Sequence, residues 1–236
     1  MKQIDEYESN FDKKNIANIY ATQKYKNEYI LKRLIGKNHK LSIIDIGCGF
    51  GSFLYHAGKN GYKNVKGIDQ SKKQIEIAKS NDLHNVENIA LELWLNKDSQ
   101  KYDVIILMDL IEHIDPNEVL SIMIRLKEKL NNHGKIIIHT PNASSPLFGH
   151  IRYGDITHKN AFTEKSLEQL AHYMQMTLTV FDDPPILNNL KGVLRRAIYH
   201  IFRVIIQLYQ YSETGRCYKT STNLYAVFKH ESNKIS

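Results

Sequence analysis

The chain has 236 residues, of which 42% are hydrophobic and 24% are charged, a composition typical of a folded globular protein rather than a disordered one. Two cysteines, Cys48 and Cys217, argue against a disulfide scaffold, and no Cys/His spacing suggests zinc, so we expect no metal. The formal net charge of +7 admits an anionic membrane surface, an anionic small molecule or nucleic acid, but no nucleic-acid motif accompanies it and we expect none bound.

Nothing in the sequence predicts secretion or a membrane span. The first ten residues are polar and acidic, unlike a secretory signal, and no stretch approaches 18 uninterrupted apolar residues. A reducing compartment suits the two cysteines. We therefore expect a cytoplasmic protein.

In chain order, the sequence predicts alternating helices and strands. A helical region over 1–35 ends at Gly36. Short apolar runs predict strands over 41–46, 65–69, 88–95, 102–108, 135–140, 178–181 and 224–228. Apolar spacing of three and four predicts helices over 53–58, 72–80 (N-cap Ser71), 117–130, 163–173 (N-cap Thr163) and 188–211, with a polar loop over 141–160. This alternation predicts an α/β fold with a mostly parallel, seven-stranded sheet and an antiparallel last strand.

No repeat or low-complexity linker divides the chain, so we expect one domain over 1–236. Its predicted parts are an N-terminal helical region, a core, a basic amphipathic helical insertion, and the last strand with the tail. They cover 1–38, 39–182, 183–220 and 221–236.

A glycine-rich turn follows the first predicted strand, where α/β folds bind ligands. It reads Asp45-Ile46-Gly47-Cys48-Gly49-Phe50-Gly51, and Asp69 ends the second strand twenty residues after Gly49. Glycines let the backbone approach a ligand, and an acid at the second strand end accepts hydrogen bonds from ribose hydroxyls. Ser52 in place of a third dinucleotide-type glycine, and Asp45 beside a would-be pyrophosphate, argue against a nicotinamide reductase.

The pattern Asp-x-Gly-x-Gly-x-Gly resembles the nucleotide-binding motif of class I S-adenosylmethionine (SAM)-dependent methyltransferases. Residues 102–114 resemble that family's fourth-strand motif with its Glu-His, and 130–135 resemble the loop before strand five, with His133 in place of one glycine. Thr140-Pro141-Asn142 matches the strand-five exit of ubiquinone-type and surface-glycan-linked O-methyltransferases. The resemblance covers about 40–230 and implies a Rossmann-like sandwich with a helical insertion before the last strand.

The resemblance also implies roles for matched residues. Asp45 positions the ammonium end of SAM, Gly47, Cys48 and Gly49 lie under its methionine part, and Asp69 takes the ribose hydroxyls. Gln70 flanks the adenosine and Met108 flanks the cofactor from strand four. The third-strand exit, Leu93-Trp94-Leu95-Asn96, lacks the acid that often lies near the adenine. For Glu112 and His113, hydrogen bonding at a helix start is favoured over catalysis.

A hydroxyl acceptor must lose a proton, and histidine suits that role near neutral pH. His158 lies in a Thr-His-x-x-x-Phe stretch that resembles the same subgroup, and Asp155 would orient it. An equally weighted role for His158 is a structural one, in which it hydrogen-bonds the loop or caps the next helix. His139 and His150 are weaker candidates, since His139 lies within a strand and a packed ring is expected there. Arg152 and Tyr153 are candidates for holding an anionic or sugar-like acceptor.

The segment 188–211 has an apolar stripe and a basic side. The basic side holds Lys191, Arg195, Arg196, His200, Arg203 and Gln207. Such a helix is typical of an anionic membrane surface, and equally of packing on the domain or on the second subunit of a homodimer. The segment resembles an insertion in methyltransferases of surface-glycan biosynthesis, which places the expected protein at the inner membrane face.

The sequence thus predicts a SAM-dependent methyltransferase that acts on a hydroxyl of a sugar or a lipid-linked glycan precursor. A quinone or phenol O-methyltransferase and an amino-sugar N-methyltransferase are the enzymatic alternatives. The alternative of another class is a non-catalytic SAM-fold binding subunit. The intact set of Asp45, Gly47, Gly49 and Asp69 argues against that alternative.

Overall fold

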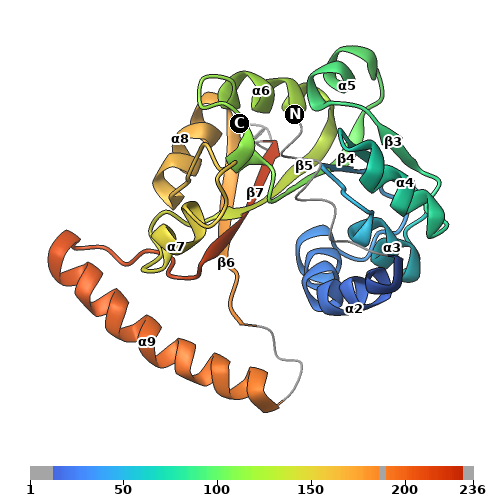
Figure 1. Cartoon of the computed structure of the whole chain (residues 1–236). Helices are drawn as coiled ribbons and strands as arrows, with labels where there is room; N and C mark the ends of the chain where they lie inside the picture. The colour runs from blue at the N-terminus through green and yellow to red at the C-terminus, as the bar shows by residue number, and fades with distance from the viewer. Residues whose placement is uncertain (1–12, 186–189, 231–236) are drawn as a thin grey trace. The chain divides into compact units, whose positions relative to one another are not determined.

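The computed structural model describes residues 13–185 and 190–230, and within them seven strands form one mixed sheet (Figure 1). The strands are β1 (Ile43–Ile46), β2 (Val65–Asp69), β3 (Val86–Asn88), β4 (Tyr102–Met108), β5 (Leu130–Pro141), β6 (Met176–Asp182) and β7 (Asn223–His230). Their order is β3-β2-β1-β4-β5-β7-β6. β2 pairs in parallel with β1 and β3, whereas β7 runs antiparallel to β5 and β6. The predicted α/β fold with an antiparallel last strand is confirmed.

Helices connect these strands, and two predicted N-caps are present. The helical elements are α2 (Lys13–Tyr29), the π-helix η2 (Ile30–Ile35), α3 (Ser52–Lys59), α4 (Lys72–Ser80), α5 (Leu91–Lys97), the 3-10 helix η3 (Ile111–His113), α6 (Val119–Glu128), α7 (Phe148–Arg152), α8 (Glu164–Tyr173) and α9 (Leu190–Thr214). The Ser71 hydroxyl accepts from the amide of Gln74, and the Thr163 hydroxyl from that of Ser166. The parts of the predicted N-terminal region, basic helix and tail that fall on 1–12, 188–189 and 231–236 lie outside the described residues.

The strand predicted over 88–95 is wrong. β3 ends at Asn88, and α5 occupies Leu91–Lys97. Trp94 and Leu95 are buried and lie three and four residues after Leu91, which is the spacing of one helical face. The apolar run therefore belongs to a short helix. A second difference is α7, which lies inside the loop predicted over 141–160.

The described residues form two compact units. The first holds the residues up to Ile106 together with Lys129–Asn131, and the second holds Leu107–Glu128 and the residues from Asn132 onward. In the first unit α2 packs beside α3, and in the second α8 packs on β6 (Figure 1). The prediction of one domain over the whole chain stays a prediction.

The first unit brings the turn after β1 into close contact with β2. A Cβ atom added at Gly67 would lie 2.7 Å from the Sγ atom and 2.9 Å from the Cβ atom of Cys48. Protein interiors are close packed, so any side chain at Gly67 must displace the glycine-rich turn.

We expect Gly67→Ala to lower the free energy of unfolding by about 1–3 kcal/mol, the usual cost of overpacking. Urea denaturation measures the change. The matched control is Gly58→Ala in α3, where an added Cβ meets nothing within 4 Å. The control is expected to be neutral or slightly stabilising, since alanine favours a helix. Equal stabilities of the two variants would contradict the close contact.

Candidate functional site

The glycine-rich turn of the first unit adopts a left-handed backbone. The φ angles of Gly47, Gly49 and Gly51 are 75°, 55° and 78°. Only glycine adopts this region without steric cost. A Cβ at Gly49 would also approach the Oε1 atom of Gln74 to 2.5 Å. The sequence therefore needs glycine here both for the conformation and for the space.

Asp69 fixes this turn from the end of β2. Its Oδ2 atom accepts a hydrogen bond from the amide of Gly49 at 2.8 Å, and its Oδ1 atom accepts one from the amide of Ser71 at 2.8 Å. The next residue, Gln70, is exposed, and its carbonyl accepts from Asn88 at 2.9 Å. The structure thus brings the predicted residues Gly49, Asp69 and Gln70 to one end of β1 and β2.

Asp45 is a buried carboxylate with an unsatisfied oxygen. Its side chain is 3% exposed, and its Oδ1 atom has no hydrogen-bond partner among the described residues. Burial, reinforced by the negative charge of Asp69, raises the pKa of Asp45 to about 7. A cationic ligand group at Oδ1 would favour the ionised form and satisfy this oxygen. The residues present therefore fit a ligand with an ammonium group.

Cys48 is also buried, and burial raises the pKa of its thiol. The thiol is neutral at physiological pH, so Cys48 acts here as a packing residue and not as a nucleophile.

α2 covers the turn, a role that the sequence did not predict for it. The Tyr20 hydroxyl donates to the carbonyl of Phe50 at 2.6 Å, and the Asn27 side-chain amide donates to the Ser52 hydroxyl at 3.0 Å. The Tyr20 ring stacks on Tyr55 at 4.6 Å between centroids. These partners lie 25 or more residues apart, so no local pattern could reveal them.

The second unit holds the predicted acid–base residues, and Glu112 ties them together. Glu112 is 1% exposed, and its side chain accepts from the Thr140 hydroxyl at 3.1 Å. Its carbonyl accepts from the amides of Lys159 and Asn160 at 2.8 and 2.9 Å. Burial, reinforced by the charge of Asp109, raises the pKa of Glu112 to about 7. The carboxyl is thus partly protonated at neutral pH.

His158 lies beside this carboxyl on the loop after β5. Its side chain is 10% exposed, and its Nδ1 atom is buried without a hydrogen-bond partner among the described residues. Its Nε2 atom lies 4.0 Å from the Oδ2 atom of Asp155. Asp155 is oriented chiefly by Thr157, whose amide and hydroxyl donate to it at 2.8 and 2.6 Å. Burial would raise the pKa of Asp155, but these hydrogen bonds hold it below its ordinary value.

His113 completes the group. Its ring lies 4.8 Å from that of His158 between centroids, and its Nδ1 atom lies 3.0 Å from the Thr157 hydroxyl. Burial, and then the neighbouring His158, lower the pKa of His113. One ligand-type atom from each of Glu112, His113 and His158 lies within 4.8 Å of the others, so the group has the donors of a transition-metal site. The three residues have no regular spacing in the sequence, which predicts no metal.

His139 on β5 is a second buried histidine with polar partners. It is 1% exposed, as expected for a packed ring, but both of its ring nitrogens face carboxylates. Nδ1 lies 2.5 Å from Asp109 Oδ1, and Nε2 lies 3.1 Å from Asp183 Oδ2. Asp109 has a φ angle of 52°, a strained value for a residue other than glycine. The structure therefore holds Asp109 in place at the end of β4, beside Met108, through His139.

The acceptor candidates lie on and after α7. The Arg152 guanidinium lies 5.4 Å from the ring centroid of Tyr153. Tyr153 is 81% exposed and the nearby Ile156 is 97% exposed. His150 is exposed at the same helix. These side chains form a solvent-facing surface in the unit that also holds His158.

Comparison with known proteins gives a family match. Residues 20–179 match the family described as "Methyltransferase domain". A Rickettsia typhi protein named "Ubiquinone biosynthesis O-methyltransferase" is 32% identical over 133 residues, which are 52% of this chain and 52% of that protein. One of the same name from Pelagibacter ubique is 36% identical over 45% of this chain and 43% of its own length. The chain thus spans about half the length, or less, of these curated relatives.

Solved structures share the fold. A SAM-dependent methyltransferase from Archaeoglobus fulgidus has a TM-score of 0.65 at 18% identity and covers 88% of this chain and 96% of its own. A plantazolicin methyltransferase in complex with S-adenosylhomocysteine (SAH) has a TM-score of 0.55 at 19% identity, and the match covers 94% of this chain and 92% of that chain. At such identities the likeness concerns the fold, and it confirms the predicted Rossmann-like architecture.

We expect Asp45→Asn to stabilise the ligand-free protein above pH 7 by about 1–3 kcal/mol. The pKa of Asp45 rises from its ordinary 3.8 to about 7 on folding, so the folded state binds a proton that the unfolded chain releases. Stability is therefore lost as pH rises from about 4 to 7, and the variant avoids this loss. Thermal unfolding at several pH values measures it. Glu76→Gln, on an exposed position of α4, should show no such pH-dependent gain, and a destabilised Asp45→Asn at pH 8 would refute the assignment.

Proposed function

The chain belongs to the methyltransferase domain family, and on that premise we propose that it binds SAM and transfers a methyl group to a hydroxyl. The observation that carries the proposal is the unsatisfied, buried Oδ1 atom of Asp45 beside the left-handed glycine turn. SAM offers an ammonium group to this carboxylate and ribose hydroxyls to Asp69. The relatives named as O-methyltransferases support transfer to oxygen.

The residues of the first unit bind and orient the cofactor in this proposal. Asp45 holds the ammonium group, and the backbone of Gly47, Cys48 and Gly49 lies under the methionine part, since the two glycines carry no side chain and the side chain of Cys48 packs against Gly67. Asp69, already oriented by two amides, accepts from the ribose, and Gln70 lies along the adenosine. The resemblance to the family also implies a cofactor contact for Met108, which ends β4 and belongs to the second unit. When bound, SAM supplies a methyl group on a sulfonium with a neutral leaving group, so alignment is the main task of the protein.

His158 takes the acceptor's proton in this proposal. Its Nδ1 atom is buried and has no partner among the described residues. A carboxylate oxygen of Glu112, whose pKa is about 7, lies within 4.8 Å of a ring nitrogen of His158. Asp155, 4.0 Å from Nε2, stabilises the protonated ring electrostatically. Glu112 and Thr157 hold the loop that carries His158, so both are positioning residues.

The acceptor that we propose is a hydroxyl of a sugar or a lipid-linked glycan precursor, held by Arg152 and Tyr153. A phenol of the quinone-precursor type is the second candidate, because the curated relatives carry ubiquinone biosynthesis in their names. The other enzymatic alternative is an amino-sugar N-methyltransferase, whose acceptor nitrogen needs less help from a base. The alternative that is not an enzyme is a SAM-binding subunit, which would have no acceptor. The proposed site of action is the cytoplasmic face of a membrane, where either lipid-linked acceptor would lie.

Calorimetric titration with SAM and SAH tests the cofactor. We expect micromolar binding that strengthens as pH rises toward 7, because ammonium binding requires ionised Asp45. Binding should weaken again as the SAM amino group loses its proton at a pH of about 8. Asp45→Asn should weaken binding and remove the rise below pH 7. Asp69→Ala should weaken binding by roughly tenfold or more with the fold intact. Wild-type protein that binds neither SAM nor SAH would overturn the proposal.

His158→Ala tests the base and discriminates between the acceptors. With a sugar hydroxyl, which is weakly acidic, turnover should fall by about 10²–10⁴-fold with SAM affinity unchanged. A phenol, with a pKa of about 10, needs the base far less and should show a smaller loss of turnover. Arg152→Ala should instead raise KM for the acceptor.

Activity before and after dialysis against EDTA is the control for metal binding by Glu112, His113 and His158. A metal role predicts loss on chelation and recovery on readdition. Unchanged turnover in His158→Ala with every acceptor would contradict the assigned role.

A further inference from the structure

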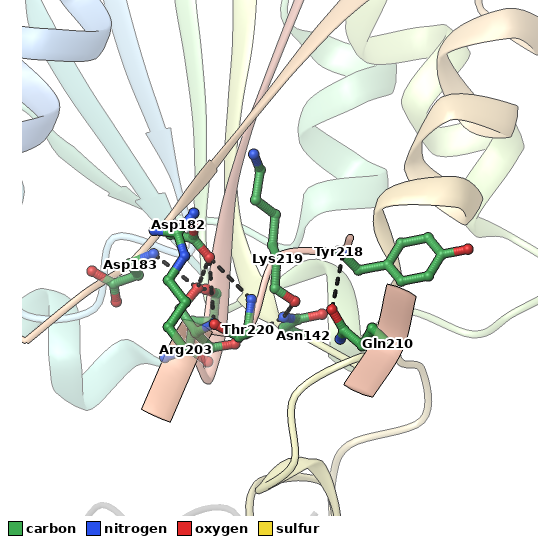
Figure 2. A network of polar contacts seen from close by, with 10 residues as sticks. Asn142, Asp182, Asp183, Arg203, Gln210, Tyr218, Lys219 and Thr220 are labelled. Carbon is green, nitrogen blue, oxygen red and sulfur yellow. Dashed lines mark hydrogen bonds and ion pairs between the residues drawn. The ribbon is translucent and has the colours of Figure 1, made fainter. Parts of the chain in front are cut away.

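Helix α9 turns its polar side toward its own unit. Figure 2 shows the side chains of Arg203 and Gln210 directed at that unit. The Arg203 Nη2 atom lies 3.2 Å from Asp182 Oδ2, and the Gln210 Oε1 atom accepts from the amide of Tyr218 at 3.0 Å. Near the start of the helix, Arg196 donates to the carbonyl of Pro185 at 3.3 Å. Three turns of one helix side are thus held by polar contacts.

The surface that receives α9 is itself a polar network. The Asp182 Oδ1 atom accepts from the amides of Thr220 and Ser221 at 3.2 and 3.3 Å and from the Ser221 hydroxyl at 3.0 Å. The Asn142 side-chain amide donates to the carbonyls of Lys219 and Ser221 at 3.1 and 2.8 Å (Figure 2). An apolar helix face would leave these charged and polar groups poorly solvated. The network therefore selects the polar side of α9 and leaves its apolar side outward.

The outward side is apolar along the whole helix. Its aliphatic side chains are exposed by 45% at Ile198 to 84% at Leu190. They are Leu190, Leu194, Ile198, Ile201, Val204, Ile205 and Leu208. Phe202, Tyr209 and Tyr211 are exposed by 58–66% along its borders. At 3.6 residues per turn, these aliphatic and aromatic side chains together cover about half of the helix circumference. A surface helix normally buries such a face.

We propose that this outward face of α9 docks on an anionic lipid bilayer and lies in the plane of the interface. Its width favours a bilayer over a second copy of the helix, because a helix–helix seam needs only the narrower stripe of two positions in seven. Exposed Lys191 and Arg195 lie on the same border as Phe202 and Tyr209, where lipid phosphates and the headgroup boundary would meet them. Residues 190–214 carry four Lys or Arg and one acid, Glu213.

The helix lies on the bilayer in this proposal and does not cross it. Among the described residues, no helix is long and apolar enough to span a membrane. The basic side expected from the sequence also needs correction. Arg196 and Arg203 are held by the protein, so the cations that reach lipid are Lys191 and Arg195.

Vesicle co-sedimentation tests the docking and requires neither SAM nor acceptor, so its failure is distinct from failure of the proposed chemistry. We expect the full chain to bind phosphatidylcholine vesicles that contain phosphatidylglycerol, and to release as salt is raised. The double variant Ile201→Ser/Leu208→Ser should lower the partition coefficient at least about tenfold. Lys191→Gln/Arg195→Gln should lower it about tenfold on the anionic vesicles.

Leu93→Ser is the matched control, because Leu93 on α5 is exposed to the same 62% as Ile201 but lies outside α9. It should bind vesicles like the wild type. Circular dichroism checks that each variant is folded. Wild-type protein that fails to bind anionic vesicles overturns the proposal. A wild-type dimer in sedimentation velocity that dissociates in the Ile201→Ser/Leu208→Ser variant, with vesicle binding unchanged, also overturns it and assigns the face to a second copy.

Discussion

The hydrogen bond from the Gly49 amide to Asp69 is the constraint on which the first unit depends. It joins the end of β2 to the turn after β1, in which Gly47, Gly49 and Gly51 have left-handed φ angles. In this turn Cys48 packs against Gly67 and leaves no room for a side chain at position 67. The same hydrogen bond also places a second carboxylate near Asp45, whose pKa is raised chiefly by burial and further by this neighbouring charge. The turn is thus built at a cost in stability that an ammonium-bearing ligand can offset.

In the second unit, hydrogen bonds to Glu112 connect the elements as those to Asp69 do in the first. One residue ties η3 to β5 through Thr140 and to the loop of His158 through two amides. The sequence offered hydrogen bonding and catalysis as competing roles for Glu112. In the structure the hydrogen bonds of Glu112 are what hold the loop, so the structural role serves the candidate base. Asp109 and His139 repeat the arrangement at the end of β4.

The sequence predicted best where the determinant is local. The alternation of apolar runs, the Ser71 and Thr163 caps and the strand over 65–69 each depend on a few neighbouring residues, and all are present. The helix over 91–97 was missed because seven residues carry too little periodicity to separate it from a strand. The contacts of His139 with Asp109 and Asp183 join residues 30 and 44 positions apart. No spacing rule reaches such pairs, and only the sheet brings them together.

The sequence predicts that α9 is amphipathic, but not which of its sides faces the protein. Amphipathicity could be read from 188–211, but a hydrophobic stripe does not say which side faces the protein. The orientation is set elsewhere, by the carboxylate of Asp182 at the end of β6 and by the amide of Tyr218. Because Arg203 pairs with the Asp182 carboxylate and Gln210 accepts from the Tyr218 amide, the polar side of α9 faces the unit and the apolar side faces outward. The position of a few part-buried polar contacts thus turns the apolar side of an ordinary amphipathic helix outward.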